Sequence, residues 1–185
     1  MRPEDLPEVY DPAEDTALLA ETIDEHLVGG EDVLEVGTGS GAVAARIADR
    51  AGRLLTTDLN PHACERARAR DLPVVRANLL DPIAADAADL IAFNPPYLPT
   101  PADEERSDWL ACALSGGPDG RRVIEPFLDD VGRVLRPDGR VFLLASTLTG
   151  LEAIREQADR AGFRTERVAE RAFPFERLVV LNIRR

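Results

Sequence analysis

The sequence predicts an α/β protein built on a seven-stranded, mostly parallel sheet, with helices on both faces and an antiparallel strand pair at its C-terminal end. Two observations predict this class. Short apolar runs alternate with helical patterns along the chain, as they do in β-α-β units. The first run leads into a glycine loop, and two others end at Asp58 and Asn94, as expected where ligands bind at the carboxyl ends of parallel strands. The 185 residues are expected to form one domain, residues 1–185.

The first half of the chain contains four expected strands separated by helices. A helix is indicated over residues 12–27, where apolar residues recur at helical spacing before a glycine pair. The expected strands are the apolar runs 32–36, 53–57, 74–75 and 90–93. Between the first three lie an alanine-rich helix over residues 42–51 and a helix that begins at Pro61, since proline suits the first position of a helix.

The second half begins with a long polar loop over residues 98–120, a length that is typical of binding loops and lids. Its Trp109 is either a substrate contact or a residue that packs the loop onto the core. After the loop we expect, in order, a helix at 122–135, a turn at 136–139, a strand at 140–145, a helix at 151–161 and strands at 165–169 and 177–183.

The charge of the chain is strongly acidic. The 34 acidic residues outnumber the 22 basic ones, the net charge is −12, and every one of the basic residues is arginine. Such a composition favours a halophilic source, where dense carboxylates hold water and ions, although a GC-rich genome also favours arginine over lysine. An acidic surface is a poor one for a phosphate backbone, which needs clustered cations.

Targeting and redox signals are absent from the sequence. No apolar run approaches the roughly 20 residues that span a bilayer, and the first residues lack a signal-peptide pattern. Cys64 and Cys112 have neither metal-ligand spacing nor a disulfide framework. We therefore expect a cytoplasmic protein that binds no membrane and no metal.

The glycine loop predicts a nucleotide-type cofactor site. Gly37, Gly39 and Gly41 alternate instead of following the dinucleotide-binding spacing, and glycines let a backbone approach a ligand closely. Glu35, two residues before the loop, can pair with a cationic amino group, which S-adenosylmethionine has and dinucleotides lack. Asp58, at the end of the second strand, is positioned to accept hydrogen bonds from ribose hydroxyls. The alternative is an ordinary strand-to-helix turn.

Asn94-Pro95-Pro96-Tyr97 predicts chemistry on a planar NH2 group. The nitrogen of such a group is a poor nucleophile because its lone pair is delocalised, so an enzyme must hold its hydrogens. The side-chain oxygen of Asn94 and the Pro95 carbonyl can accept them. Pro95 and Pro96 fix the backbone, and Tyr97 can stack on the flat group. Asn-Pro-Pro also makes ordinary turns, so the tetrapeptide alone is only moderately specific.

Three segments together make the chain resemble a known family. Residues 9–16, the cofactor loop 35–41, and residues 115–121 with their Gly-Gly-x-x-Gly pattern resemble class I S-adenosylmethionine-dependent methyltransferases that carry the Asn-Pro-Pro-Tyr motif. More narrowly, they resemble the HemK-type glutamine methyltransferases that modify class 1 translation release factors, in the short archaeal and eukaryotic branch. The resemblance covers nearly the whole chain and implies a Rossmann-like fold.

The resemblance also implies a role for individual residues. The tetrapeptide would hold the substrate amide, with Asn94 between cofactor and substrate, and residues 1–30 would cover the cofactor site. The residues implied to bind S-adenosylmethionine are Thr16, Glu35, Gly37, Gly39, Gly41, Asp58, Leu59, Asn78, Leu79 and Asn94. Asn78 departs from the aspartate that is common at its position.

The implied reaction is methyl transfer to the side-chain amide nitrogen of a protein glutamine, in the Gly-Gly-Gln loop of a release factor. The alternative is a nucleic-acid amino-methyltransferase acting on adenine N6 or guanine N2, because that chemistry is shared. The acidic surface opposes it. A third class, a non-catalytic subunit of a methyltransferase heterodimer, is opposed by the intact motifs.

The resemblance further implies a protein partner. Members of this branch need a small zinc-binding activator subunit that covers the sheet edge at the third strand. In this chain that edge comprises Leu72, Pro73, Val74 and Val75, and we expect an exposed apolar strip there. The alternative is an ordinary short edge strand.

Overall fold

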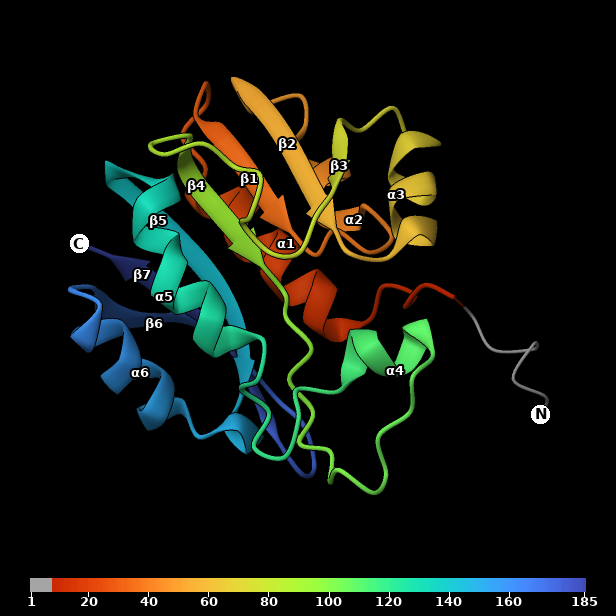
Figure 1. The fold of residues 1–185 in the computed structure, drawn as a ribbon. Helices are drawn as coiled ribbons and strands as arrows, with labels where there is room; N and C mark the ends of the chain where they lie inside the picture. The colour runs from red at the N-terminus through yellow and green to blue at the C-terminus, as the bar shows by residue number, and fades with distance from the viewer. Residues whose placement is uncertain (1–7) are drawn as a thin grey trace.

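The computed structural model describes residues 8–185, and its centre is a seven-stranded sheet of order β3-β2-β1-β4-β5-β7-β6 (Figure 1). The strands β1 to β5 pair in parallel, and β7 runs antiparallel to both of its neighbours. This confirms the predicted fold class, including the C-terminal antiparallel pair. The strands are β1 (Asp32–Val36), β2 (Arg53–Asp58), β3 (Val74–Arg76), β4 (Ala88–Phe93), β5 (Leu135–Ser146), β6 (Arg164–Ala172) and β7 (Arg177–Arg184).

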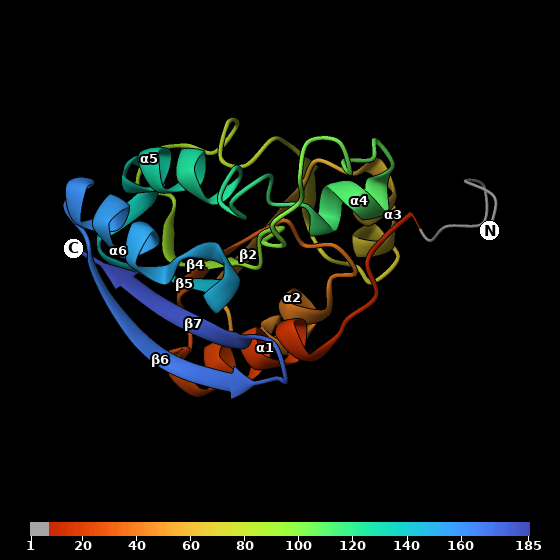
Figure 2. The same cartoon turned by 90° about the horizontal axis from the view of Figure 1, so that it is seen from below.

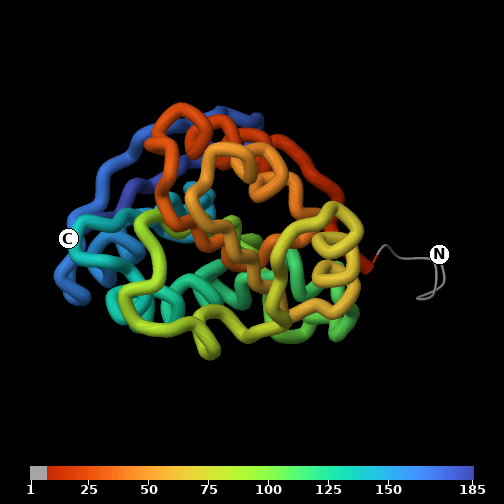
Figure 3. The backbone as a smooth tube through the Cα atoms, turned by 90° about the horizontal axis from the view of Figure 1, so that it is seen from above, coloured from red at the N-terminus to blue at the C-terminus, as the bar shows by residue number. Residues whose placement is uncertain are grey.

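Helices cover both faces of the sheet. Seen along the sheet, α1 and α2 lie on one side and α5 and α6 on the other (Figure 2), and the view from the opposite end shows the red α1 and the teal α5 separated in the same way (Figure 3). The helices are α1 (Glu14–His26), α2 (Ala42–Ile47), α3 (Pro61–Arg68), α4 (Trp109–Leu114), α5 (Ile124–Val134) and α6 (Leu151–Arg160), with a 3-10 turn at Thr147–Thr149.

The central strands are buried on both faces, which is why they appear in the sequence as continuous apolar runs. Along β4, Leu90 and Ala92 pack in the cluster formed with α1 and α2, whereas Ile91 and Phe93 pack in the cluster formed with α5. The alternation follows from the two-residue period of a strand. Two cores of this kind hold the sheet rigid beneath its carboxyl edge.

Helix α2 ends at Ile47, earlier than predicted, and two further regions differ from the sequence prediction. The loop 98–120 contains a short helix, α4, whose first turn is capped by Asp108, the Oδ1 of which accepts a hydrogen bond from the Ala111 amide at 3.1 Å. Strand β5 begins at Leu135, earlier than predicted, because the expected turn is an irregularity inside it: the pairing with β4 jumps from Leu135 to Arg140.

The strip predicted on β3 is only partly exposed. β3 is an edge strand, as expected, and Pro73 and Val75 are exposed. The prediction that Leu72 is exposed is wrong, because Leu72 is 6% exposed and packs with Ala44 of α2 and Ala67 of α3. Val74 is half-buried beside the same cluster.

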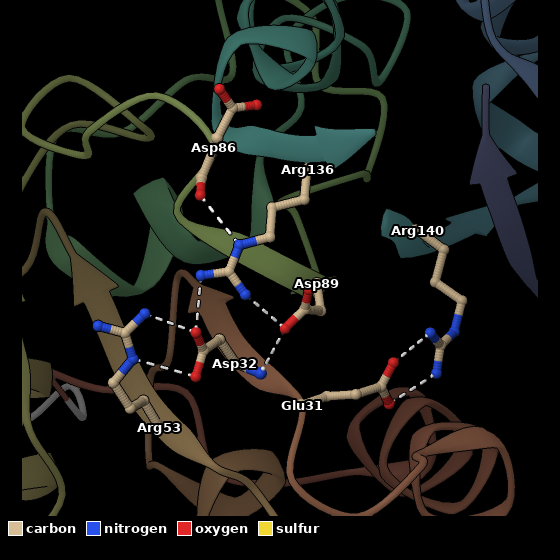
Figure 4. A network of polar contacts seen from close by, with 7 residues as sticks. All are labelled: Glu31, Asp32, Arg53, Asp86, Asp89, Arg136 and Arg140. Carbon is tan, nitrogen blue, oxygen red and sulfur yellow. Dashed lines mark hydrogen bonds and ion pairs between the residues drawn. The ribbon is translucent and has the colours of Figure 1, made fainter. Parts of the chain in front are cut away.

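The amino ends of the strands are joined by an ion-pair network (Figure 4). Arg136 donates to Asp32 of β1 at 2.8 Å and to Asp89 of β4 at 2.6 Å, and Arg53 of β2 also pairs with Asp32. Arg53 and Arg136 hold the pKa of the Asp32 carboxyl well below its usual range. The network therefore ties four strands together at the end of the sheet opposite the glycine loop.

Within residues 8–185, no helix is both long enough and apolar enough to cross a membrane.

Candidate functional site

A cavity of about 230 Å³ opens at the carboxyl ends of the central strands. β1 pairs with β2 on one side and with β4 on the other, so the strand order reverses here. Such a reversal is where open α/β sheets bind ligands. Its wall contains all of the residues predicted from the sequence except one: Thr16, Glu35, Gly37, Gly39, Asp58, Leu59, Asn78, Leu79, Asn94, Pro95, Pro96 and Tyr97.

The exception is Gly41, which the structure does not bring to the cavity wall. Gly37, Gly39 and Gly41 all have positive φ, at 65°, 53° and 76°. A Cβ on Gly41 would lie 2.8 Å from Cδ1 of Leu72, whereas one on Gly39 would meet nothing within 4 Å. Gly41 therefore lets α2 begin close to the segment before β3, and Gly37 and Gly39 form the wall.

Glu35 is a buried carboxyl group at the end of β1. Its Oε2 accepts hydrogen bonds from the Thr38 hydroxyl at 2.7 Å and from the Ala44 amide at 3.2 Å. Burial raises the pKa of Glu35 to about 7, although these two bonds oppose the shift. Within the described chain no cation pairs with it. A cationic ligand in the cavity would supply the charge that this carboxylate lacks.

Asp58 ends β2 and organises the loops on either side. Its Oδ2 accepts from the Gly39 amide and its Oδ1 from the Asn60 amide, both at 2.8 Å. Burial raises the pKa of the Asp58 carboxyl, while these backbone amides lower it. Because a carboxylate oxygen has more than one acceptor site, Asp58 can also accept from hydroxyl groups in the cavity.

The far end of the cavity is formed by the segment after β3. Asn78 is exposed and Leu79 is half-buried, and both line the cavity. Leu79 has a φ of 48°, which is unusual for a residue other than glycine. Together with the exposed Leu59, this segment gives the cavity one apolar flank and a side-chain amide.

Asn94 lies at the end of β4 with its two amide atoms in different surroundings. Its Nδ2 donates to Oδ2 of Asp15 at 3.3 Å. Its Oδ1 is buried and has no partner within residues 8–185. A buried acceptor left unpaired costs about 1–3 kcal/mol. Asn94 lines the cavity, so the unpaired acceptor belongs to a side chain of the cavity wall.

The glycine segment after α4, residues 116–120, packs against the backbone at the end of the tetrapeptide. The Gly116 amide donates to the Leu98 carbonyl at 2.9 Å, and the Leu98 amide donates to the Leu114 carbonyl at 3.0 Å. A Cβ on Gly120 would lie 2.5 Å from the Tyr97 carbonyl oxygen, and one on Gly116 would lie 2.5 Å from the Gly120 carbonyl oxygen. The glycines are needed because three stretches of backbone are packed together.

Two tyrosine hydroxyls face the Asp15 carboxylate. Burial, followed by the negative charge of Asp15, raises the pKa of Tyr10 to about 12 and raises that of Tyr97 further above its ordinary value. Glu176, just before β7, acts on both in the same direction. Both hydroxyls therefore stay protonated at neutral pH.

Several residues of the cavity wall were not singled out by the sequence reasoning. Tyr10 and Asp15 lie in the N-terminal segment, and Cys112 lies on α4 beside Trp109. Trp109 lines the cavity, which favours the first of its two interpretations. The signal for Asp15 was its position beside Thr16 in a motif segment, but only the fold brings it to Asn94. The first seven residues, part of the expected cover 1–30, lie outside the described residues.

Comparison with known proteins identifies the class. Residues 10–107 match the family model of the methyltransferase small domain. A protein of Methanocaldococcus jannaschii, provisionally named a protein N5-glutamine methyltransferase, is 35% identical over 183 residues, covering 95% of this chain and 91% of that protein. The human methyltransferase HEMK2 is 35% identical over 190 residues, covering 95% of this chain and 89% of that protein.

A solved structure agrees over the whole fold. It is the Mtq2–Trm112 complex from E. cuniculi, described as responsible for methylation of the translation termination factor eRF1. The match has a TM-score of 0.82 and 27% identity, and covers 97% of this chain and 99% of that one.

The fold, the cavity at the strand reversal and the buried acceptor at its wall define an enzyme of the methyltransferase class, whose fold family uses S-adenosylmethionine. The chain belongs to the methyltransferase small domain family, in the group that contains HEMK2 and the Methanocaldococcus protein.

Proposed function

We propose that the protein transfers a methyl group from S-adenosylmethionine to the side-chain amide nitrogen of a protein glutamine, in the Gly-Gly-Gln loop of a class 1 translation release factor. The observation that carries this proposal is the buried Oδ1 of Asn94 at the cavity wall, which has no partner among residues 8–185. The names and titles of the relatives support the choice of a glutamine and of a termination factor.

The cavity residues fit S-adenosylmethionine. Glu35, a buried carboxyl group without a cationic partner in the described chain, would pair with the amino group of the cofactor. Asp58 would accept from the ribose hydroxyls, and the segment with Asn78 and Leu79 would flank the adenine. When bound, the cofactor supplies an electrophilic methyl group on a sulfonium.

The chain itself contributes alignment. Oδ1 of Asn94 and the Pro95 carbonyl would accept the two hydrogens of the glutamine amide and hold its nitrogen toward the methyl group. Tyr97 would pack on the amide plane, with its backbone held by Gly120. Positioning of this kind contributes several kcal/mol to catalysis when reacting atoms are held about 3 Å apart. No strong base is needed, since the proton can leave after transfer.

A methyl-transfer assay tests the proposed function. The purified chain, with its partner subunit if one is required, is given labelled cofactor and a release factor, and the same factor carrying Gln→Ala in its Gly-Gly-Gln loop. Label on the first protein alone is expected, and Asn94→Ala should abolish it while leaving much of the cofactor affinity. Label on DNA or tRNA and none on protein would support the nucleic-acid alternative instead.

We also propose that a small zinc-binding activator subunit docks on the edge of β3. The edge position of β3 and the exposure of Pro73 and Val75 support it, as does the match to a chain in complex with Trm112. Val75 is 39% exposed and nearby Leu59 is 51% exposed.

Val75→Asp should weaken the complex, because a carboxylate would lose its hydration in an apolar contact. Co-purification with a Trm112-type subunit is the measurement, and Val28→Asp, at an apolar position that is 67% exposed and outside this edge, is the control. Equal recovery of the complex with both variants would place the partner elsewhere.

We further propose a halophilic source and a cytoplasmic location. The net charge of −12 and the absence of lysine support the first, and the second follows from the intracellular process that the proposed substrate serves.

A further inference from the structure

The side-chain amide of Asn94 donates a hydrogen bond to Asp15. The side-chain amide of asparagine ends in two groups of nearly the same size. The NH2 group donates hydrogen bonds through Nδ2, and the oxygen Oδ1 accepts them. Here Nδ2 donates to Asp15 Oδ2 at 3.3 Å, and Oδ1 has no partner among residues 8–185. Turned over, the side chain would present its NH2 group to the cavity and its oxygen to a carboxylate.

Asp15 is itself fixed. It is 5% exposed, in the first turn of α1, and its Oδ1 accepts a hydrogen bond from the Thr16 amide at 2.6 Å. The raised pKa values of Tyr10 and Tyr97 keep both of these hydroxyls protonated as donors facing the same carboxylate. Donors therefore surround Asp15, and its Oδ2 lies toward Asn94.

A carboxylate is an acceptor only, so it tolerates just one orientation of the neighbouring amide. Hydrogen bonds to charged groups are stronger than neutral ones, and the reversed orientation would set two acceptors against each other. The orientation matters to the proposed reaction, because a substrate NH2 group needs an acceptor and an inverted Asn94 would offer a second donor.

We propose that Asp15 is a positioning residue that locks the Asn94 side chain with Oδ1 facing the substrate amide. This inference rests on the proposed function, since it concerns how that site grips an NH2 group. It also gives residues 9–16 a part in the chemistry beyond covering the cofactor. Asp15, in the first turn of α1, would decide whether Asn94 at the end of β4 presents an acceptor or a donor to the substrate.

A donor–acceptor exchange tests the lock. Asp15→Asn has the same shape, but its NH2 group can donate to Asn94 and so favours the inverted orientation. We expect kcat to fall at least about tenfold, the scale of one charge-assisted hydrogen bond. The cofactor dissociation constant should be unchanged. Asn94→Asp alone should be at least as damaging, because it sets two carboxylates side by side.

The double variant Asp15→Asn with Asn94→Asp is the decisive one. The amide introduced at position 15 would then donate to one oxygen of the carboxylate introduced at position 94. The other oxygen would be left to accept from the substrate, so activity should rise above that of Asn94→Asp alone. A residue that only stabilised α1 would give no such rescue. Glu25→Gln, an exposed acid on the same helix, is the control and should keep wild-type kcat.

A second readout needs no turnover. In wild type, one side-chain Nδ2 proton of Asn94 should show the downfield NMR shift of a hydrogen bond to a carboxylate, and Asp15→Asn should remove it. Wild-type kcat in Asp15→Asn, no rescue in the double variant, or an unshifted proton would each overturn the inference. A wild-type enzyme that labels no glutamine but shows the shifted proton would instead count against the proposed function.

Discussion

At the scale of single residues, the carboxyl groups of Asp58 and Glu35 both line the cavity but have different surroundings. Asp58 is stabilised by two backbone amides, whereas Glu35 has a hydroxyl and one amide and no cation in the described chain. The pKa of Glu35 is accordingly raised to about 7, far above the usual range of a glutamate. An active-site carboxyl group of this kind is prepared for a cationic ligand and costs stability when the site is empty.

Glu35 predicts a pH dependence of cofactor binding. Below pH about 7 the carboxyl group is protonated and binding the ammonium requires its proton to leave, so affinity should fall by up to about tenfold per pH unit. Calorimetric titration with S-adenosylmethionine between about pH 5.5 and about pH 8 measures this. Glu35→Gln should bind weakly with a flat profile. A flat wild-type profile would contradict the assignment.

The pH dependence of folding stability has the opposite sign to that of cofactor affinity. The folded-state pKa lies above the unfolded one, so the stability of the cofactor-free protein should decline as pH rises from about 4.3 through about 7.

Residue identities at this site were predictable where a motif is continuous in sequence. Glu35, Gly37 and Gly39 lie within one continuous segment at the end of β1, and Asn94 stands in its own tetrapeptide. The role of Asp15 was not predictable, because its partner is 79 residues away and is reached only through packing of α1 across the sheet.

At the scale of elements, the tetrapeptide Asn94–Tyr97 and the glycine segment 116–120 form one unit. Leu98 and Ser115 form a parallel bridge, the Thr100 amide donates to the Gly117 carbonyl at 2.8 Å, and Gly120 contacts the Tyr97 carbonyl. The Gly-Gly-x-x-Gly pattern is thereby explained as a backing for the loop that carries Asn94. Under the proposed function, the glycines would affect the reaction through the backbone position of Tyr97.

Gly120→Ala should therefore lower kcat for methyl transfer by more than its loss of folding stability would suggest. Its Cβ would lie 2.5 Å from the Tyr97 carbonyl oxygen, so the loop must shift. Gly162→Ala is the matched control, because its φ is also positive, at 83°, but its Cβ would meet nothing within 4 Å. Both variants carry about 1 kcal/mol of backbone strain.

The measurement is kcat beside the thermal unfolding midpoint. We expect Gly120→Ala alone to lose at least about tenfold in kcat, since misplacement by about 1 Å can cost a hundredfold. Equal kcat in the two variants would refute the backing role.

Element type was predictable from periodicity, and element ends were less so. All seven strands were expected, and the central ones, such as β1 and β4, were marked by apolar runs that are buried on both faces. Helix α4 was missed because its six residues are too few to show a period and none is buried. The early start of β5 was missed because Pro137 and Gly139 favour a turn, which the strand accommodates as an irregularity.

At the scale of the whole molecule, the two ends of the sheet differ: one carries an ion-pair network and the other carries the cavity. The amino ends hold the network of Arg53, Arg136 and their carboxylates, and the carboxyl ends hold the cavity. Outside the network, a net charge of −12 is distributed over the chain and repels itself. Exposed ion pairs contribute little individually, so the repulsion dominates the response to salt.

Salt should therefore stabilise the protein. Raising the ionic strength from about 0.01 M to about 0.15 M shortens the screening length from about 30 Å to about 8 Å, and the unfolding temperature should rise. Arg136→Gln should steepen this rise, because it leaves Asp32 and Asp89 facing each other without that cation. Arg155→Gln, whose exposed pair with Glu152 spans 3.7 Å, is the control. An unfolding temperature that falls with salt would contradict this account of the charge.

Methylation of a glutamine amide at this site is tested most directly by the position of the added methyl group. A release factor treated with the enzyme and cofactor is digested and fragmented in a mass spectrometer. We expect one added methyl on the side-chain nitrogen of the glutamine in the Gly-Gly-Gln loop, and none with Asn94→Ala. A methyl group on any other residue, or a release factor left unmodified while a nucleic-acid base gains the methyl group, would contradict it.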